Sequence, residues 1–569
     1  MRSRLITVAV TLASFLSSGA NARHKHNSAH HEFPTVEAPA GSIMGQSTSG
    51  IETFAGIPFA HPPIGQLRLR PPVRLQERLH FFNATGPAAY CPQITLSAEA
   101  QSTVDNAIGT GIITLPNIVG QEDCLTITIK RPMGVKEGHK LPVLFWIYGG
   151  GFQTGGTEQF NGSLFTSYAN ELNQPFIFVA VNYRLGGFGF LAGKEILVDG
   201  AANLGILDQR MGLEWVADNI ASFGGDPDKV TIWGESAGSL SVAIQMALYD
   251  GDNTYKEKPL FRGAIMDSGS VMPAEAVDSA KGQDIYDQVT AAAGCAGLNS
   301  LQCLRGLDFE TFRRAANSVP LDFSYTSISN SYMPRPDGRT ITESTDVLFK
   351  TGRYSAVPMI NGIQEDEGTL FMIFPRNITT TNALANYLSE YVFEKASDSQ
   401  LHQLVDLYSP QPDAGSPYRT GNRGELYPGF KRNAALAGDL LFILQRRYQL
   451  AQATALNPNV PAWSYMGSYG HGTPGILGTS HASDLPHFFG GVPANYATYA
   501  MRRYYTNFIA HLDPNVCYQC DNSDLVKWPE WGATKQLLQF NANSSDLIDD
   551  DFRDDAYKFI SAHTSVLRF

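Results

Sequence analysis

Short apolar segments that alternate with helical patterns constrain the fold of this chain most. The segments are rich in β-branched and aromatic residues, are apolar on both faces, and lie at 142–148, 176–183, 229–233, 262–266, 357–362 and 462–465. Residues 211–222 between them place their apolar side chains on one helical face. Because strands apolar on both faces must be covered on both sides, the pattern predicts one large α/β domain with a mostly parallel sheet.

The first 22 residues have the pattern of a secretory signal peptide. Arg2 and Arg4 precede the mostly apolar residues 5–16, and Ala20-Asn21-Ala22 has the small residues of a cleavage site. No later apolar run approaches 20 residues, so no transmembrane anchor is expected. The predicted organisation is a signal peptide, a flexible histidine-rich arm and a single domain, at residues 1–22, 23–34 and 35–569.

Composition agrees with a secreted chain and argues against nucleic acid as a partner. The formal net charge is −12 and no long basic block occurs. The six cysteines suit an oxidising compartment, and although they allow 15 pairings, pairing of sequence neighbours is favoured. Candidate glycosylation sites in N-x-S/T sequons are Asn83, Asn161, Asn377 and Asn543. No metal or organic cofactor is expected, and the sequence does not indicate an oligomeric state.

A G-x-S-x-G motif at residues 234–238 carries the strongest chemical signal. A strand pattern precedes it and an apolar helical pattern follows, which is the strand–turn–helix arrangement that exposes a nucleophilic serine. The motif makes Ser236 the candidate nucleophile. Three glycines, 149–151, follow an earlier strand and can turn backbone N–H groups into one cavity. With the N–H of Ala237, they form a candidate oxyanion hole.

A serine nucleophile also needs a histidine base and a carboxylate that orients it, in the chain order serine, acid, histidine. The candidate acids follow a predicted strand and are Glu365, Asp366 and Glu367. The candidate bases follow the last predicted strand and are His471, His481 and His487. Spacing does not choose within either set.

The chain resembles the type-B carboxylesterase/lipase family, the cholinesterase-like branch of the α/β-hydrolases, and secreted fungal lipases and sterol esterases above all. The similarity runs from about Thr35 to the C-terminus, and its motifs are residues 54–60, 122–125, 146–152, 207–210, 223–227 and 234–238. The resemblance implies an α/β-hydrolase fold, a large sheet with helices on both faces. It places the acid on Glu367, in a D-E-G turn, and the base on His481, in a G-x-x-H segment.

The resemblance also implies an oxyanion hole at Gly150, Gly151 and Ala237. The disulfides that it implies are Cys91–Cys124 and Cys295–Cys303, whereas Cys517 and Cys520 match no family-wide bridge. In similar lipases the loop closed by the first bridge is a lid. Its apolar content here favours the same role, and the alternative is a static flap that packs on the core.

The predicted function is a secreted serine ester hydrolase, lipase-like on acylglycerols or other long-chain esters such as sterol esters, which it meets at a lipid–water interface. A short-chain carboxylesterase for soluble acyl or aryl esters is the alternative. A non-catalytic binding protein is a distant alternative, because nucleophile, base and acid are all present. Choline esters are disfavoured, since residues 91–124 lack the tryptophan expected in a cation cage.

Overall fold

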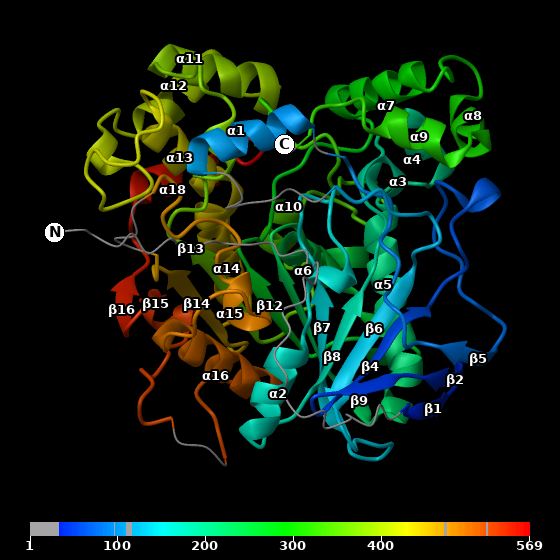
Figure 1. Cartoon of the computed structure of the whole chain (residues 1–569). Coiled ribbons are helices and arrows are strands. Elements are labelled where there is room, and N and C mark those ends of the chain that lie inside the picture. The colour runs from blue at the N-terminus through cyan, green and yellow to red at the C-terminus, as the bar shows by residue number, and fades with distance from the viewer. Residues whose placement is uncertain (1–32, 96, 110–116, 322, 471–474, 519–521) are drawn as a thin grey trace, which may run out of the picture.

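The computed structural model describes residues 33–569 apart from 96, 110–116, 322, 471–474 and 519–521. An eleven-stranded sheet runs through the described part, with helices on both faces (Figure 1). In spatial order its strands are β16 (Ser545–Asp549), β15 (Gln536–Phe540), β14 (Ala462–Gly467), β13 (Met359–Gln364), β12 (Gly263–Asp267), β9 (Gly225–Glu235), β7 (Leu141–Ile147), β8 (Ile177–Val181), β6 (Thr126–Pro132), β4 (Ile51–Pro58) and β3 (Gln46–Thr48). Neighbours from β15 to β8 are parallel, and β16, β6, β4 and β3 pair antiparallel at the two sides.

The predicted fold class is confirmed, and the six predicted strands coincide with β7, β8, β9, β12, β13 and β14. Strands at the sides of the sheet were not predicted, because their faces are not uniformly apolar; β16 is Ser-Asp-Leu-Ile-Asp and only its first residue is buried. Two small sheets were also missed. They consist of β1 (Thr35–Ala38), β2 (Gly41–Met44) and β5 (Leu79–Asn83), and of β10 (Thr254–Tyr255) and β11 (Lys258–Pro259).

Helices cover both faces of the sheet. On one face lie α2 (Ser163–Glu171), α15 (Leu485–Phe489) and α16 (Tyr496–His511). On the other lie α5 (Leu204–Asn219), α6 (Ala237–Ala247), α10 (Thr345–Lys350) and α14 (Leu444–Leu456). The predicted helix at 211–222 corresponds to the second half of α5 and the turn that follows it.

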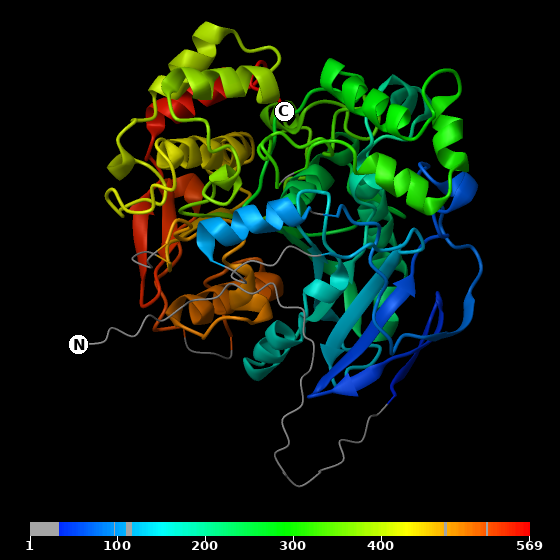
Figure 2. The ribbon, with the colours of Figure 1, turned by 45° about the horizontal axis from the view of Figure 1, so that its top comes forward.

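The remaining helices lie largely beyond one end of the sheet, in two groups with α1 beside them (Figure 2). One group is α3 (Gly186–Phe190), α4 (Lys194–Asp199), α7 (Ala280–Ala292), α8 (Ser300–Gly306) and α9 (Phe309–Ala316). The other is α11 (Thr381–Tyr387), α12 (Asp398–Asp406), α13 (Phe430–Gly438) and α18 (Asp554–Ala562). The remaining two are α1 (Ala98–Ile108) and the short α17 (Trp531–Thr534).

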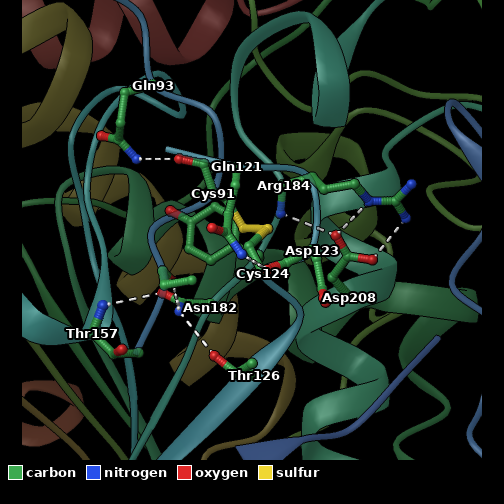
Figure 3. Close-up of a disulfide and its surroundings, with 12 residues drawn as sticks. Cys91, Gln93, Gln121, Asp123, Cys124, Thr126, Thr157, Asn182, Arg184 and Asp208 are labelled. Atoms are coloured by element: carbon green, nitrogen blue, oxygen red, sulfur yellow. Dashed lines mark hydrogen bonds and ion pairs between the residues drawn. A yellow bond between two sulfur atoms is a disulfide. The ribbon is translucent and has the colours of Figure 1, made fainter. Parts of the chain in front are cut away.

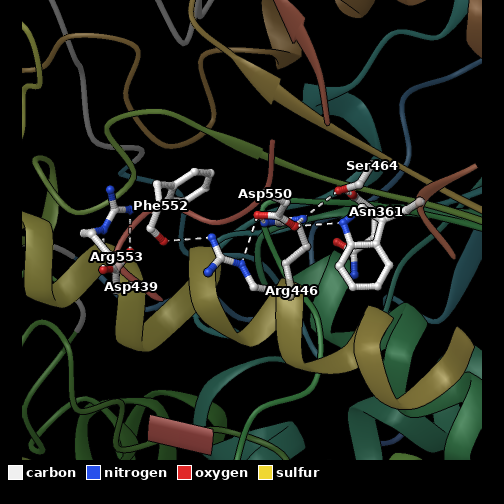
Figure 4. Close-up of polar contacts among 9 residues, drawn as sticks. Asn361, Asp439, Arg446, Ser464, Asp550, Phe552 and Arg553 are labelled. Carbon is white, nitrogen blue, oxygen red and sulfur yellow. Dashed lines mark hydrogen bonds and ion pairs between the residues drawn. The ribbon is translucent and has the colours of Figure 1, made fainter. Parts of the chain in front are cut away.

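Helices α13 and α14 are joined by a π-helical turn, η8 (Asp439–Ile443), which buried ion pairs hold in place (Figure 4). Arg446 donates two hydrogen bonds to Asp550, both at 2.7 Å, and a third to Ser464 of β14 at 2.8 Å. Arg553 donates to both carboxylate oxygens of Asp439 at 2.6 and 2.7 Å. Removing one partner of such a buried pair leaves an uncompensated charge and costs about 3–5 kcal/mol, so the C-terminal region fixes this turn firmly.

Candidate active site

Ser236 occupies the sharp turn between β9 and α6. Its backbone has φ 57° and ψ −125°, a strained conformation of the kind found where a strand turns directly into a helix to expose a nucleophile. Packing requires glycine on both sides of it. A Cβ on Gly234 would lie 2.3 Å from the carbonyl carbon of Gly238, and one on Gly238 would lie 2.0 Å from the carbonyl oxygen of Ile147.

His481 lies between Ser236 and Glu367. Its Nε2 is 2.8 Å from the Ser236 hydroxyl oxygen, and its Nδ1 is 2.6 Å from Oε2 of Glu367. The other oxygen of Glu367 accepts a hydrogen bond from the backbone N–H of Gln364 at 2.7 Å. Glu367 is 0% exposed and His481 7% exposed, whereas Ser236 is partly exposed. The arrangement orients the imidazole from one side and leaves the serine accessible from the other.

The alternative acids and bases lie elsewhere or have other partners. Glu365 pairs with Arg419 at 2.5 Å. His487 is buried, its Nδ1 is 2.6 Å from the Thr498 hydroxyl, and burial lowers its pKa to about 4. His471 lies outside the described residues. Among the described candidates, only Glu367 and His481 are hydrogen-bonded to one another with the serine in reach.

Asp366, the third candidate acid, connects the acid turn to the histidine loop. Its N–H donates to the carbonyl of Thr479, and the N–H of Thr479 donates to Asp366 Oδ2, both at 2.9 Å. Its Oδ1 accepts hydrogen bonds from the Ser416 hydroxyl and the Tyr418 N–H, both at 2.8 Å. Burial, followed by the charge of Glu365, raises the pKa of Asp366 to about 7. Three separate chain segments therefore meet on one buried carboxyl group.

The glycine loop lies directly against Ser236. A Cβ on Gly149 would be 2.8 Å from the Ser236 Cβ, and Gly150 and Gly151 have positive φ values of 105° and 62°. The N–H groups of Gly150, Gly151 and Ala237 donate to no atom of the described residues. Three unpaired donors beside the serine hydroxyl suit the binding of a developing oxyanion.

Sequence reasoning missed a buried carboxyl group beside the imidazole. Glu235 Oε1 lies 3.5 Å from His481 Nε2 and has no hydrogen-bond partner within the described chain. Burial raises the pKa of Glu235 well above its usual range, and the charges of Asp484, Glu367 and Asp267 raise it further. The acid form is favoured, so this group adds little charge beside the histidine. In the sequence, the only feature that pointed to Glu235 was its position directly before the candidate nucleophile Ser236.

Two phenylalanines that the sequence did not single out hold the imidazole ring. Phe442 of η8 stacks on His481 with ring centroids 4.4 Å apart and planes 26° apart. Phe371 approaches the same ring at 5.2 Å. A π-helical turn widens a helix locally and often occurs at functional sites. Here η8 carries Phe442, so the ion pairs of Figure 4 also support the orientation of His481.

The disulfide Cys91–Cys124 closes a loop whose first residues include Gln93 (Figure 3). Gln93 Nε2 donates to the carbonyls of Cys91 and Gly155 at 2.9 and 2.8 Å, and Gln93 Oε1 accepts from the Gly155 N–H at 2.7 Å. These bonds anchor the base of the disulfide loop to residues that follow the candidate oxyanion donors.

Helix α1 lies within this loop and packs its apolar face over the candidate site. Val104 is wholly buried and Ala100 nearly so. They pack in one apolar cluster with Ile108, Phe323, Leu370, Phe374 and Leu477. Leu370 is three residues after Glu367 and Leu477 is four before His481, so α1 rests on the segments that carry the candidate acid and base. Residues 110–116 of the loop lie outside the described residues.

Both disulfides implied by the resemblance are present, Cys91–Cys124 and Cys295–Cys303. Cys520 lies outside the described residues, so the pairing of Cys517 with it stays a prediction. The asparagines of all four sequons are exposed. Within the described ranges, no cluster of three or more histidine, cysteine or acidic side chains could hold a metal ion, and no helix is long and apolar enough to cross a membrane.

Comparisons with known proteins agree with the fold and show the family. The family model described as the carboxylesterase family matches residues 32–560. The chain is 54% identical to "Secreted triacylglycerol lipase LIP1" of Gibberella zeae over 538 residues, which cover 94% of this chain and 91% of that protein. It is 50% identical to "Secreted lipase 1" of Botryotinia fuckeliana, over 93% of this chain and 92% of that one.

A solved structure, EstA of Aspergillus niger, has the same fold with a TM-score of 0.77 and 25% identity, over 94% of this chain and 99% of that one. The family match and these relatives extend over nearly the whole described chain. The chain therefore belongs to the carboxylesterase family and is a secreted carboxylic ester hydrolase.

Proposed function

We propose that Ser236, His481 and Glu367 hydrolyse long-chain esters, acylglycerols above all, through an acyl-enzyme. The observation that carries the proposal is the hydrogen-bonded chain from Ser236 Oγ through both nitrogens of His481 to Glu367, at 2.8 and 2.6 Å. The names of the Gibberella and Botryotinia relatives support a lipid ester as the substrate.

In the proposed reaction, Ser236 Oγ bonds to the ester carbonyl carbon while His481 Nε2 takes the hydroxyl proton. The N–H groups of Gly150, Gly151 and Ala237 stabilise the oxyanion; losing one such donor typically costs about 10²–10³-fold in rate. The intermediate collapses, the bond to the alcohol oxygen breaks, and Nε2 gives its proton to that oxygen. Water then attacks the acyl-enzyme by the same steps in reverse and releases the acid. Glu367 holds the Nδ1–H tautomer and stabilises the imidazolium throughout.

We further propose that residues 1–22 are a cleaved signal peptide, that residues 23–34 are an arm, and that 35–569 form the single catalytic domain. The α1 loop is proposed to be a lid. Its apolar face is buried over Leu370 and Leu477, and a lipid surface could replace those contacts.

The substrate class is tested by hydrolysis of a chain-length series of esters, each measured below and above its solubility limit. We expect long-chain esters to be hydrolysed faster once an interface forms, because the apolar face of α1 then gains an alternative partner. Saturation on dissolved short-chain esters, with no increase at the interface, would instead identify a short-chain carboxylesterase and make α1 a static flap.

Asp366 is proposed to be a positioning residue for the acid and base. An asparagine at this position can orient its amide in two ways. In one, its NH₂ group faces the Thr479 N–H, so two donors meet; in the other, Ser416 and Tyr418 lose their acceptor. A buried donor left unpaired costs about 1–3 kcal/mol. We expect Asp366→Asn to lower kcat by about 10- to 100-fold with little change in KM, because the distance between His481 and Glu367 is disturbed rather than the ester pocket.

Glu365→Gln, which removes the pair with Arg419 and one charge near Asp366 but leaves the hydrogen bonds of Asp366 in place, is the matched control and should keep most of the activity. Melting temperature against pH separates positioning from simple destabilisation. Because burial raises the pKa of Asp366 from 3.8 to about 7, its ionisation destabilises the wild-type fold as pH rises between those values. Asp366→Asn has no group that ionises there. Its melting temperature should therefore improve relative to that of wild type as pH rises from 3.8 to about 7. An unchanged kcat would refute the positioning role.

A further inference from the structure

A groove with a volume of about 350 Å³ lies on the surface beside the start of α16. Its lining residues are Ala494, Asn495, Tyr496, Tyr499, Asp524 and Leu525. Tyr496 and Tyr499 are three residues apart on α16 and therefore share one face of the helix. Tyr499 is 52% exposed, which leaves a large aromatic surface open to solvent. The groove is therefore lined by two aromatic side chains and one carboxylate.

The turn between β15 and β16 meets this groove. The N–H of Tyr496 donates to the carbonyl of Ala542 at 3.2 Å. The next residue, Asn543, is exposed and begins the sequon Asn543-Ser544-Ser545. A sugar attached to Asn543 would thus begin at the residue next to Ala542, whose carbonyl contacts the groove residue Tyr496.

We propose that this groove is the docking site of an N-linked glycan carried by Asn543. The first N-acetylglucosamine units would lay their C–H faces on Tyr499 and Tyr496. Aromatic rings suit this contact because their faces carry partial negative charge and the sugar C–H groups partial positive charge. The carboxylate of Asp524, exposed and without a side-chain hydrogen bond within the described chain, accepts from the sugar hydroxyl groups.

Because the glycan is covalently attached to Asn543, even a weak contact is sufficient for it to occupy the groove. A short covalent tether gives a bound group an effective concentration in the millimolar range, so the glycan needs no high intrinsic affinity for the groove. Docking would shield Tyr499 and add a contact between the turn at Asn543 and α16. The inference depends on secretion and glycosylation and not on the ester reaction, so activity is not its readout.

The test is the rate at which endoglycosidase H trims the Asn543 glycan of the folded enzyme, secreted from a host that adds high-mannose glycans. Site-resolved glycopeptide mass spectrometry follows wild type, Tyr499→Ala and Tyr499→Phe. We expect trimming at Asn543 to be about three- to tenfold slower in wild type than in Tyr499→Ala, the range set by one aromatic contact. Tyr499→Phe, which keeps the ring, should trim as slowly as wild type.

After denaturation the three proteins should be trimmed at one rate, which shows that folding and not glycan composition causes the difference. Asn161, an exposed sequon with its side-chain oxygen already bonded to the Ser163 N–H, provides the comparison within the same molecule and should not respond to the Tyr499 variants. An unglycosylated Asn543 in the secreted protein, or equal trimming in folded wild type and Tyr499→Ala, would overturn the proposal.

Discussion

Ser236→Ala is expected to lower kcat by on the order of 10⁶-fold while the protein stays folded. The variant lacks the oxygen that His481 Nε2 approaches at 2.8 Å, so no acyl-enzyme can form. A methyl group fits the site because alanine is smaller than serine and the strained backbone of the turn is held by packing around Gly234 and Gly238. Single-turnover kinetics on a dissolved ester and the melting temperature measure the two parts of this expectation.

Ser239→Ala is the matched control. Ser239 lies on the same helix three residues later, but its hydroxyl donates to the carbonyl of Gly269 at 2.9 Å and does not contact His481. It should retain activity within about tenfold and should react with a fluorophosphonate probe, whereas Ser236→Ala should not. Labelling of Ser236→Ala would assign the nucleophile to another residue. Failure of the wild type to label would revive the binding-protein interpretation.

The second large effect is expected from Glu367→Gln, with kcat about 10⁴-fold lower at neutral pH. The Gln364 N–H already occupies one oxygen of the wholly buried Glu367, and the other faces His481 Nδ1 at 2.6 Å. In the variant, the Gln364 backbone N–H holds the amide oxygen of the new glutamine, so the NH₂ group of that glutamine faces His481 Nδ1. This favours the imidazole tautomer with its proton on Nε2. That nitrogen then cannot accept the serine proton, and no carboxylate stabilises the imidazolium. Steady-state kinetics measure the loss.

Glu365→Gln also controls for this substitution, since it makes the same chemical change two residues earlier. It should change kcat by less than about threefold, because Glu365 pairs with the half-exposed Arg419 and forms no hydrogen bond with His481 or Ser236. A large loss in Glu365→Gln with a small loss in Glu367→Gln would reassign the acid to Glu365. Equal small losses would mean that the triad needs no carboxylate.

Much of the fold could be predicted because the central strands are mostly buried, and β8, β12, β13 and β14 wholly so. Because a buried strand is covered on both faces, the segments that became β7, β9 and β13 each contain a short apolar run that can be found in the sequence. Strands such as β16 lie at the side of the sheet and mix polar with apolar residues. Their place depends on pairing with a neighbour, which leaves no local periodicity to find.

For the site, the sequence by itself pointed to Ser236 and the glycine loop as candidates, because a strained turn and close backbone approaches demand glycine at fixed offsets. The residues alone left three acids and three histidines open, and only the resemblance distinguished Glu367 and His481. Nothing in the residues themselves shows which carboxyl group meets the imidazole. The tertiary structure decides it, because a side chain's partner depends on where separate segments converge. Asp366 faces Thr479, Ser416 and Tyr418, whereas its neighbour Glu367 faces His481.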